Sequence, residues 1–416
     1  MNKRNTYKLV EICDIKSGKR IPKGMDYVEY ETEYPYIRAR DIKDGRIRTD
    51  SLIYLEDDVR NRIKKYIINE GDIAITIVGA SVGDVGYADS EVDGYNLTEN
   101  AVRLTNFHQE INSRYLFYLL YQKKYHDYMQ LVAGAAAQPK LGIYKVERIK
   151  VTVPSRQTQD QVVEVLANYD HLIDTNKKRI ASLEHMADEV YREWFVRQRF
   201  PGFEKSMKTD CGLPEGWYEK KLGEFGISLE SGSRPKGGID SNLESGVPSL
   251  GAEAINGLAE FDYSSVKLIP EEHYFAMKQG KNKGNHILIY KDGAYIGKVT
   301  LFQNGFPYEV YAINEHVFFL NSKDKEYQNF LFFTLKQGAY YTIMQNLNRN
   351  AAQPGLSRPD IERVKVIFPD YETVAKFNDF VEPILASVFD LAKQNRILEQ
   401  QRDLLLPRLM GGKISI

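Results

Sequence analysis

The stretch that decides the fold is residues 158–199, TQDQVVEVLANYDHLIDTNKKRIASLEHMADEVYREWFVRQR. Apolar residues recur along it at alternating steps of four and three, which is the spacing of a coiled-coil seam. The row consists of Val162, Leu166, Tyr169, Ile173, Asn176, Ile180, Leu183, Ala187, Val190 and Trp194. We predict a helix of roughly 40 residues and about 60 Å. Thr158 and Gln161 are expected to form a capping box at its start, and Pro201-Gly202 to end it.

A second row with the same spacing lies 215 residues later. It consists of Phe377, Val381, Ile384, Val388, Leu391, Asn395, Leu398, Arg402, Leu405 and Leu409. A long apolar seam must be buried, and each helix is the obvious partner for the other. We therefore expect the two helices to pair as an antiparallel coiled coil with pseudo-two-fold symmetry. The alternative is that each is an ordinary core helix of its own domain, but ordinary helices are far shorter.

The repeat extends beyond the two helices. The sequence AAQPKL at residues 136–141 matches AAQPGL at residues 351–356, again 215 residues apart. At the same offset, VERIKVTVP at residues 146–154 matches IERVKVIFP at residues 361–369. Further upstream the offset drifts by one or two residues, as loop insertions would cause. The chain is therefore predicted to be a tandem duplication.

Each repeat reads as a mixed α/β domain followed by a long helix, so the predicted fold class is α+β. Strands are expected at residues 72–78 and 286–290, and again at 149–153 and 364–368. Apolar residues at helical spacing favour helices within residues 115–128 and 327–344. The predicted organisation is a first globular domain at residues 1–154, a long helix and linker at 155–212, a second globular domain at 213–369 and a C-terminal helix at 370–416.

The composition of the 416 residues is typical of a soluble globular protein, with 43% hydrophobic and 27% charged residues. No apolar run approaches the ~18 residues of a membrane span, and the N-terminal MNKRN is not followed by the apolar core of a signal peptide. Cys13 and Cys211 are too few for a disulfide framework, so we expect reduced thiols in the cytoplasm. The formal net charge of −1 means that nucleic acid would be bound by local basic patches.

Several kinds of catalytic motif are missing from the sequence. There is no Gly-x-x-x-x-Gly-Lys-Ser/Thr phosphate loop, no dinucleotide-binding glycine spacing and no Cys/His cluster with metal-ligand spacing. An Asn-Pro-Pro-aromatic methyltransferase signature and a paired-carboxylate nuclease motif are missing as well. We therefore expect a protein with no catalytic residues, no metal and no cofactor of its own.

The informative residues lie in polar loops that recur in both repeats. Arg and Lys contact phosphates and read guanine, Asn and Gln read adenine, and glycine lets the backbone approach closely. Arg38 and Arg40 fall opposite Gly251 and Glu253, so charged loop positions differ between the repeats while glycines and prolines persist. Two DNA readers with one fold and different targets would have this pattern. The candidate DNA-binding residues are Lys19, Arg20, Lys23, Arg38, Arg40, Lys43, Arg46, Gln138, Lys140, Arg234, Lys236, Asn348, Arg349, Asn350, Gln353 and Arg358.

The chain resembles the specificity subunit of a type I restriction–modification enzyme over essentially its whole length. The most specific matches are Gln138-Pro139 and Gln353-Pro354 before the repeated strands, EWFV at residues 193–196 with RFPG at 199–202, and LLLPRL at 404–409. The resemblance implies two target recognition domains held apart by two antiparallel helices, each domain reading half of a bipartite target in double-stranded DNA. It also implies two kinds of partner: modification subunits, which methylate adenine with S-adenosylmethionine, and ATP-driven restriction subunits.

Two other functions stay open from the sequence alone. A scaffold could use the same coiled coil and domains to bind proteins instead of DNA, and a self-contained methyltransferase would bind S-adenosylmethionine itself. For the restriction–modification interpretation, the duplication predicts two near-equivalent docking surfaces and hence two modification subunits per chain. These surfaces would include Glu193, Phe195 and the segment 404–409.

The register of the helix pair can be predicted from two asparagines. When the first position of one row meets the tenth of the other, Asn176 faces Asn395, and Arg402 lies beside Tyr169, where a cation–π contact can form. Facing amides satisfy each other, whereas a slipped register leaves them unpaired at about 1–3 kcal/mol. The alternative is that both asparagines bind water where the coil splays. A fixed register would hold the half-sites about one turn of DNA apart, ~34 Å.

Overall fold

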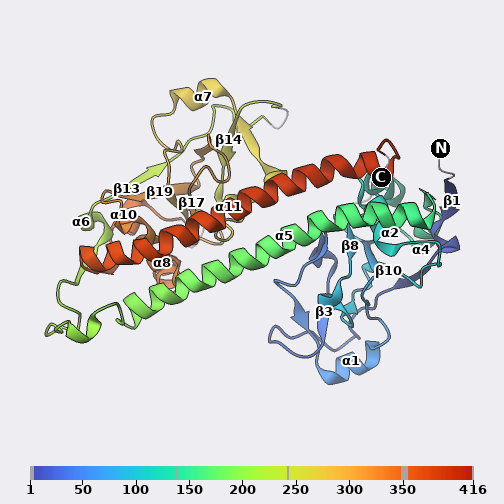
Figure 1. The fold of residues 1–416 in the computed structure, drawn as a ribbon, viewed down its shortest axis with the longest axis horizontal. Helices are drawn as coiled ribbons and strands as arrows, with labels where there is room; N and C mark the ends of the chain where they lie inside the picture. Colours follow the sequence, from blue (N-terminus) through green and yellow to red (C-terminus); the bar gives the residue numbers. More distant parts are fainter. Residues whose placement is uncertain (1–3, 136–137, 241–242, 348–354, 415–416) are drawn as a thin grey trace. The chain divides into compact units, whose positions relative to one another are not determined.

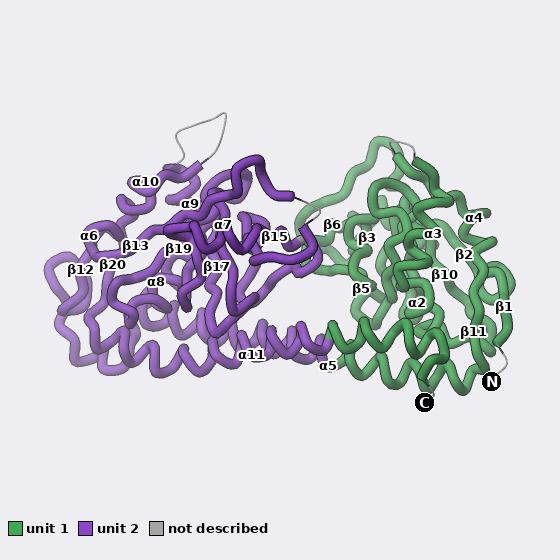
Figure 2. Tube along the Cα trace, turned by 90° about the horizontal axis from the view of Figure 1, so that it is seen from above, with its two compact units in different colours: residues 1–171, 399–416 green, residues 172–398 purple. Residues whose placement is uncertain are grey.

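The computed structural model describes residues 4–135, 138–240, 243–347 and 355–414, and it divides into two compact units. Unit 1 comprises Met1–His171 and Glu399–Ile416, and unit 2 comprises Leu172–Leu398 (Figure 2). Two long helices, α5 (Arg156–Tyr191) and α11 (Tyr371–Met410), each contribute a segment to both units (Figure 1). The rest of each unit is one α+β domain, as the sequence predicts.

Unit 1 is built on three small sheets. The largest has the strand order β2 (Asp14–Ser17), β10 (Ala101–Thr105), β7 (Ile73–Thr76), β8 (Val85–Tyr87), β5 (Gly45–Ile47), β4 (Ile42–Lys43). The second has the order β6 (Ile53–Tyr54), β3 (Pro35–Ile37), β9 (Asn96–Leu97), and the third pairs β1 (Asn5–Lys8) with β11 (Lys150–Val153). The short helices are α1 (Asp57–Ile63), α2 (Ser113–Tyr121), α3 (Lys123–Ala133) and α4 (Ile143–Glu147).

Unit 2 repeats this topology except for two strands of the largest sheet. Its largest sheet has the order β13 (Ile227–Ser231), β19 (Val317–Ser322), β16 (His286–Tyr290), β17 (Val299–Phe302). The other two are β15 (Lys267–Ile269), β14 (Val247–Leu250), β18 (Ala312–Ile313), and β12 (Tyr218–Lys221) with β20 (Lys365–Phe368). The helices are α6 (Leu222–Phe225), α7 (Glu271–Ala276), α8 (Tyr327–Lys336), α9 (Gly338–Asn346) and α10 (Arg358–Glu362). This correspondence confirms the tandem duplication.

The units differ most clearly at one hairpin. In unit 1 the strands β4 and β5 extend the largest sheet, and β5 pairs with β8 in parallel. In unit 2 the equivalent sheet ends at β17. The hairpin carries the candidate residues Lys43 and Arg46, so within the described residues this charged hairpin belongs to unit 1 alone. In each unit the helix that follows β6 or β15, which is α1 or α7, lies at the end of the domain away from the long helices (Figure 1).

Two predicted helical stretches are each broken once. Gln122 separates α2 from α3, and Gln337 separates α8 from α9. Both glutamines have extended backbone angles, near φ −62 and ψ 141 for Gln122 and φ −63 and ψ 139 for Gln337. Their side chains donate back to the preceding helix, to the carbonyls of Leu119 (3.2 Å) and Phe333 (3.0 Å). A glutamine side chain therefore ends α2 in unit 1 and α8 in unit 2 in the same way.

The start of α5 corrects one prediction. The helix begins at Arg156, so Thr158 lies inside its first turn and the capping box of Thr158 and Gln161 is wrong. Ser155 performs the capping, because its Oγ accepts from the backbone N–H of Thr158 (3.4 Å). The buried Gln159 then fixes the helix start by donating to the carbonyls of Glu110 and Pro154 (3.0 Å each). At the other end α5 passes into a π-helical turn, Arg192–Val196, before Pro201.

The paired helices form the predicted antiparallel seam within each unit. In unit 2, Asn176 Nδ2 donates to Asn395 Oδ1 (3.0 Å) and to Gln394 Oε1 (2.9 Å), which confirms the predicted contact. Trp194 lies against Phe377, with ring centroids 6.0 Å apart, in the same register. In unit 1 the buried seam residues Val162 and Leu166 belong to the same apolar cluster as Leu406 and Leu409.

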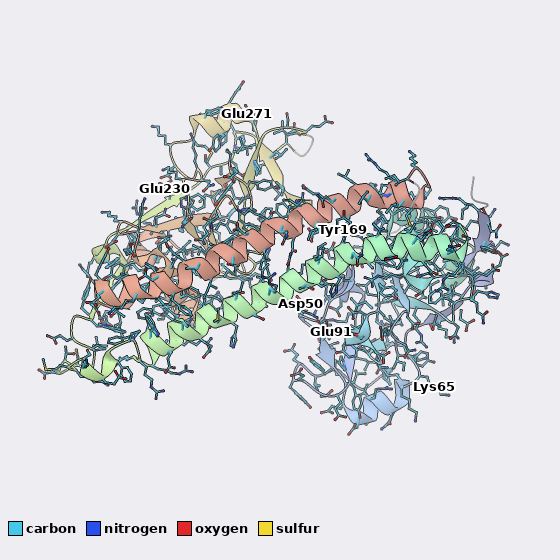
Figure 3. The ribbon with its side chains drawn as sticks, viewed as in Figure 1. Asp50, Lys65, Glu91, Tyr169, Glu230 and Glu271 are labelled. Carbon is cyan, nitrogen blue, oxygen red and sulfur yellow. The ribbon has the colours of Figure 1, made fainter. Side chains whose placement is uncertain are left out.

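The contact made by Arg402 differs from the one that the sequence predicts. The guanidinium Nη1 of Arg402 donates to Asp170 Oδ1 (2.8 Å). Asp170 follows Tyr169, which lies on α5 (Figure 3). The ion pair replaces the predicted cation–π contact, because a carboxylate is a stronger acceptor for a guanidinium than a ring face is. No helix in the described part of the chain is long and apolar enough to cross a membrane.

Candidate nucleic-acid interface

The same five segments converge in both units, and we call them the loop cluster of a unit. In unit 1 they are residues 17–20, 37–41, 77–79, 98–100 and 138–141, and in unit 2 they are residues 231–234, 250–254, 291–293, 314–316 and 355–356. Three backbone hydrogen bonds that join them recur at equivalent positions. In unit 1 they are Thr98 N–H to Ile37 O (3.0 Å), Ile77 N–H to Asn100 O (2.8 Å) and Leu141 N–H to Ile77 O (2.8 Å). In unit 2 they are Asn314 to Leu250 (2.9 Å), Lys291 to His316 (3.0 Å) and Leu356 to Lys291 (2.9 Å).

A glycine is essential at the first segment of each cluster. A Cβ on Gly18 would lie 2.0 Å from Thr98 O, and a Cβ on Gly232 would lie 1.5 Å from Ile313 O. Any side chain would therefore push this segment away from the neighbouring backbone. Both repeats retain glycine at this position. The glycine keeps the residue two positions later close to segment 98–100 in unit 1 and close to segment 314–316 in unit 2.

That residue is an arginine in both units, and each arginine meets a glutamate. Arg20 Nε lies 2.7 Å from Glu99 Oε1, and Arg234 Nε lies 3.0 Å from Glu315 Oε1. The glutamates occupy equivalent positions, because β9 and β18 pair in parallel with β3 and β14 in the same register. Neither glutamate is among the candidate residues predicted from the sequence. The signal was available, since NLTEN at residues 96–100 corresponds to AINEH at 312–316.

Arg38 and Arg40 differ sharply in their surroundings. Arg38 Nε and Nη2 donate to the two carboxylate oxygens of the buried Asp41 (2.8 Å each), and Nη2 also donates to Ser51 O. Only 18% of the Arg38 side chain is exposed, whereas 70% of the Arg40 side chain is exposed. Arg38 therefore braces the turn at residues 39–41, and Arg40 is the one that reaches solvent. Whether either reads a base stays a prediction.

The other candidates vary in exposure and partners. Lys23, Lys43, Lys140, Lys236 and Gln138 are exposed, and Arg46 is half-buried. Lys19 lies over the ring of Tyr66, 5.6 Å from its centroid. Arg358, on α10, pairs with Glu362 (2.8 Å). The candidates Asn348, Arg349, Asn350 and Gln353 lie outside the described residues.

Unit 2 has an additional polar group in its cluster, formed by His316, Asp292 and Glu315. His316 lies 3.2 Å from Asp292 Oδ2 through Nδ1 and 3.4 Å from Glu315 Oε1 through Nε2. The equivalent positions in unit 1 hold Asn100 and Val78, so the two clusters present different surfaces. Among the described side chains no group of His, Cys, Asp and Glu could hold a metal ion.

A cavity of about 620 Å³ opens elsewhere in unit 1, beside the end of α11. It is lined by apolar residues and by several charged groups, including Asp44, Asp84, His126, Asp403, Leu406 and Pro407. Burial raises the pKa of the Asp84 carboxyl, and the neighbouring His126 at 3.3 Å opposes this shift. None of the five segments of the loop cluster contributes to the lining of the cavity.

A duplicated α+β domain with recurring polar loops, joined by paired helices, is the architecture of a protein with two related binding sites. Residues 1–185 and 214–400 match the sequence profile of the type I restriction modification DNA specificity domain. The chain therefore belongs to this family, and it carries the domain twice. Its role is that of a DNA-specificity subunit, and the comparisons give no support to a scaffold that binds proteins alone.

Relatives support the family assignment over most of the chain. The specificity subunit of the type I restriction enzyme MjaIX of Methanocaldococcus jannaschii is 27% identical over 319 residues, which is 73% of this chain and 69% of the relative. The MjaVIII specificity subunit of the same organism is 23% identical over 405 residues, which is 96% of this chain and 90% of the relative. The crystal structure of the type I restriction–modification S subunit from M. genitalium has a TM-score of 0.58 at 17% identity, covering 98% of this chain and 96% of that one. This last likeness shows a shared fold.

Proposed function

We propose that each unit reads one half of a bipartite DNA target through its loop cluster. The observation that carries the proposal is the recurrence of the cluster: the same hydrogen bonds hold the same segments, while exposed side chains such as Arg40 and Glu253 differ. A backbone retained with changed surface chemistry is expected of two readers of different sequences, because phosphate contacts position a protein and base contacts specify the sequence. The exposed candidates within or beside the clusters are the proposed contacts.

The chain is proposed to act only as the reader in a larger complex. Methylation with S-adenosylmethionine and ATP-driven restriction would belong to separate modification and restriction subunits, in the cytoplasm where the DNA is. The isolated chain should therefore bind neither S-adenosylmethionine nor ATP. Equilibrium dialysis with each labelled compound tests this, and saturable binding of S-adenosylmethionine would favour a self-contained methyltransferase instead.

The proposed docking surfaces for two modification subunits need one adjustment. Phe195 lies in an aromatic cluster of unit 2, with its ring centroid 4.9 Å from that of Phe330 and 5.0 Å from that of Phe377. Exposed neighbours are better placed to meet a partner: Val196 is 60% exposed in unit 2 and Leu404 is 63% exposed in unit 1. Native mass spectrometry of the assembled complex should show two modification subunits per chain, and saturation at one would contradict the proposal.

The distance between the half-sites is also part of the proposal. The polar contact of Asn176, Gln394 and Asn395 fixes the register of the long helices, and we propose that this register sets the spacer at about one helical turn of DNA.

The experiment that tests half-site reading uses equivalent positions in the two units. Arg40→Ala should relax or weaken recognition of one half-site by roughly 1–3 kcal/mol if Arg40 contacts a base. Glu253→Ala changes the equivalent position of unit 2, so it should alter the other half-site and leave the first intact. The measurement is sequencing of methylated sites in cells that contain the full chain and its modification subunit.

Arg38→Ala serves as the control for a structural effect. Because the Arg38 guanidinium braces Asp41 and Ser51, its loss should lower the stability of unit 1 and reduce binding to every sequence. If Arg40→Ala instead weakens binding equally at both half-sites, and the affinity depends less steeply on salt concentration, then Arg40 is a phosphate contact.

A further inference from the structure

The Arg20–Glu99 and Arg234–Glu315 pairs form the one charged contact that the two loop clusters share at equivalent positions among the described residues. Neighbouring positions have changed: Lys19 corresponds to Ser233, and Asn100 corresponds to His316. Exposed ion pairs contribute little to stability. Arg20 is 82% exposed and Arg234 is 37% exposed, so neither pair is buried, and holding the fold together does not explain why the pair recurs.

The backbone beneath each pair is the same in both units. The residue before the glutamate accepts a hydrogen bond from the residue after it: Asn100 N–H donates to Thr98 Oγ1 (3.3 Å), and His316 N–H donates to Asn314 Oδ1 (2.9 Å). Together with the close approach of Gly18 and Gly232, this turn sets where the glutamate stands relative to the arginine. The fold therefore builds the pair, which is not a chance meeting of two long side chains.

The geometry leaves the recognition edge of each arginine available. In both pairs the contact with the glutamate is made through Nε, so the two terminal nitrogens can still donate to another acceptor. Two parallel N–H donors match the O6 and N7 atoms of guanine in the major groove. A phosphate is the poorer partner, because the pair as a whole is neutral and the carboxylate repels a second anion. Neutralising a phosphate and releasing its counterions requires net positive charge.

We propose that Arg20 and Arg234 each read a guanine, one in each half-site, and that Glu99 and Glu315 are positioning residues that aim them. This inference rests on the proposed function of the loop clusters. It implies that both half-sites contain a G·C pair at an equivalent place, although the rest of their sequences differ.

The test uses the full chain assembled with its modification subunit, and it maps methylated sites and binding to a pool of random duplexes. Arg20→Ala should make one G·C position degenerate, with a loss of discrimination on the order of 10- to 100-fold, and leave the other half-site unchanged. Arg234→Ala should do the same in the other half-site. Neither variant should change the slope of binding against salt concentration. Weaker binding to every sequence, with the slope of log affinity against log salt concentration lower by about one, would overturn the proposal and make the arginines phosphate contacts.

Two further variants separate positioning from folding. Glu99→Gln should reduce guanine discrimination at the same base position as Arg20→Ala, by a smaller factor, without changing other positions. Arg20→Lys should fail to restore discrimination, because an ammonium lacks the planar fork of donors. Full discrimination in either variant would overturn the roles assigned here. A wild-type complex that binds no duplex would refute the proposed function itself, whereas sequence-specific binding with an unchanged motif in both arginine variants would refute only this inference.

Discussion

The two units attach their recognition domain to the long helices by opposite chemistry. In unit 1, the buried Asp170 of α5 accepts from Arg402 of α11 (2.8 Å) and from the Tyr118 hydroxyl of α2 (2.5 Å), and it lies 3.4 Å from Arg114. In unit 2, the equivalent positions of Asp170, Arg402 and Tyr118 are Leu385, Ala187 and Phe333. There the joint is an aromatic cluster in which Phe377 touches Tyr191, Trp194, Phe195 and Phe333.

The difference shows that one duplicated fold has two ways to fix the same helix pair. A buried ionic network is directional, and it is satisfied only when all of its members are present. Burial and then the Asp170 carboxylate raise the pKa of Tyr118, so the phenol stays protonated and donates to Asp170. An aromatic cluster instead depends on the area it buries and on edge-to-face contacts. The two joints should therefore respond differently to single substitutions.

The largest effect is expected in the aromatic joint. Phe377→Ala removes a fully buried ring that contacts four aromatic neighbours, and it should lower the free energy of unfolding by about 3–5 kcal/mol. Phe380→Ala is the matched control on the same helix, because Phe380 is 43% exposed, and it should change stability by less than ~0.5 kcal/mol. Denaturant unfolding measures the change in the free energy of unfolding, and hydrogen exchange shows in which unit the amides lose protection. Equal losses of protection in both units would contradict a joint specific to unit 2.

A smaller loss is expected in the ionic joint, and it should be partly reversible. Asp170→Leu removes the buried carboxylate partner of Arg402, whose side chain is only 15% exposed, and leaves it with the exposed Asp403, at a cost of about 2–4 kcal/mol. Adding Arg402→Ala and Tyr118→Phe introduces the residue types found at the equivalent positions of unit 2. These two changes should recover at least half of the lost stability. Unfolding of the single and triple variants provides the measurement. A triple variant less stable than the single would show that the network cannot be replaced by apolar packing.

Substitutions at Asn176 and Asn395, the buried polar contact between the long helices, should have the smallest effect on stability, and they should also change function. Asn176→Leu or Asn395→Leu alone leaves a buried amide short of a partner, at about 1–3 kcal/mol. The double variant should be more stable than either single variant, because no amide is left unpaired in the seam. It should also allow slipped registers, so methylated sites with more than one spacer length are expected. A single unchanged spacer in the double variant would show that the asparagines do not set the distance.

Periodicity was the part of the sequence that predicted structure best. The heptad rows and the 215-residue offset identify both long helices, their antiparallel register and the Asn176–Asn395 contact, because a seam repeats one simple constraint many times. Single contacts were predicted less well. Arg402 pairs with Asp170 instead of Tyr169, since neighbouring residues on one helix turn compete for the same cation. Thr158 is not a cap, because the helix starts earlier at Arg156.

The candidate interface was predicted as a set of loops, and the relations among its residues were not. Basic and amide residues in loops are visible in the sequence, but the brace between Arg38 and Asp41 is a matter of side-chain direction. The Arg20–Glu99 pair joins residues 79 positions apart, so only the folded chain brings them together. Comparison of the two repeats could have found the glutamates, because the same charge stands after both β9 and β18.

The most direct test of half-site reading is to replace the domain of unit 2 by that of unit 1. Residues 5–153, from β1 to β11, would be placed where residues 218–368, from β12 to β20, now stand. Leu385→Asp and Ala187→Arg would supply the ionic joint that the domain of unit 1 uses. If each domain reads its own half-site, the methylated sites should become an inverted repeat of the first half-site, since the helices pair antiparallel. A map that still contained two different halves would contradict this division of reading between the two units.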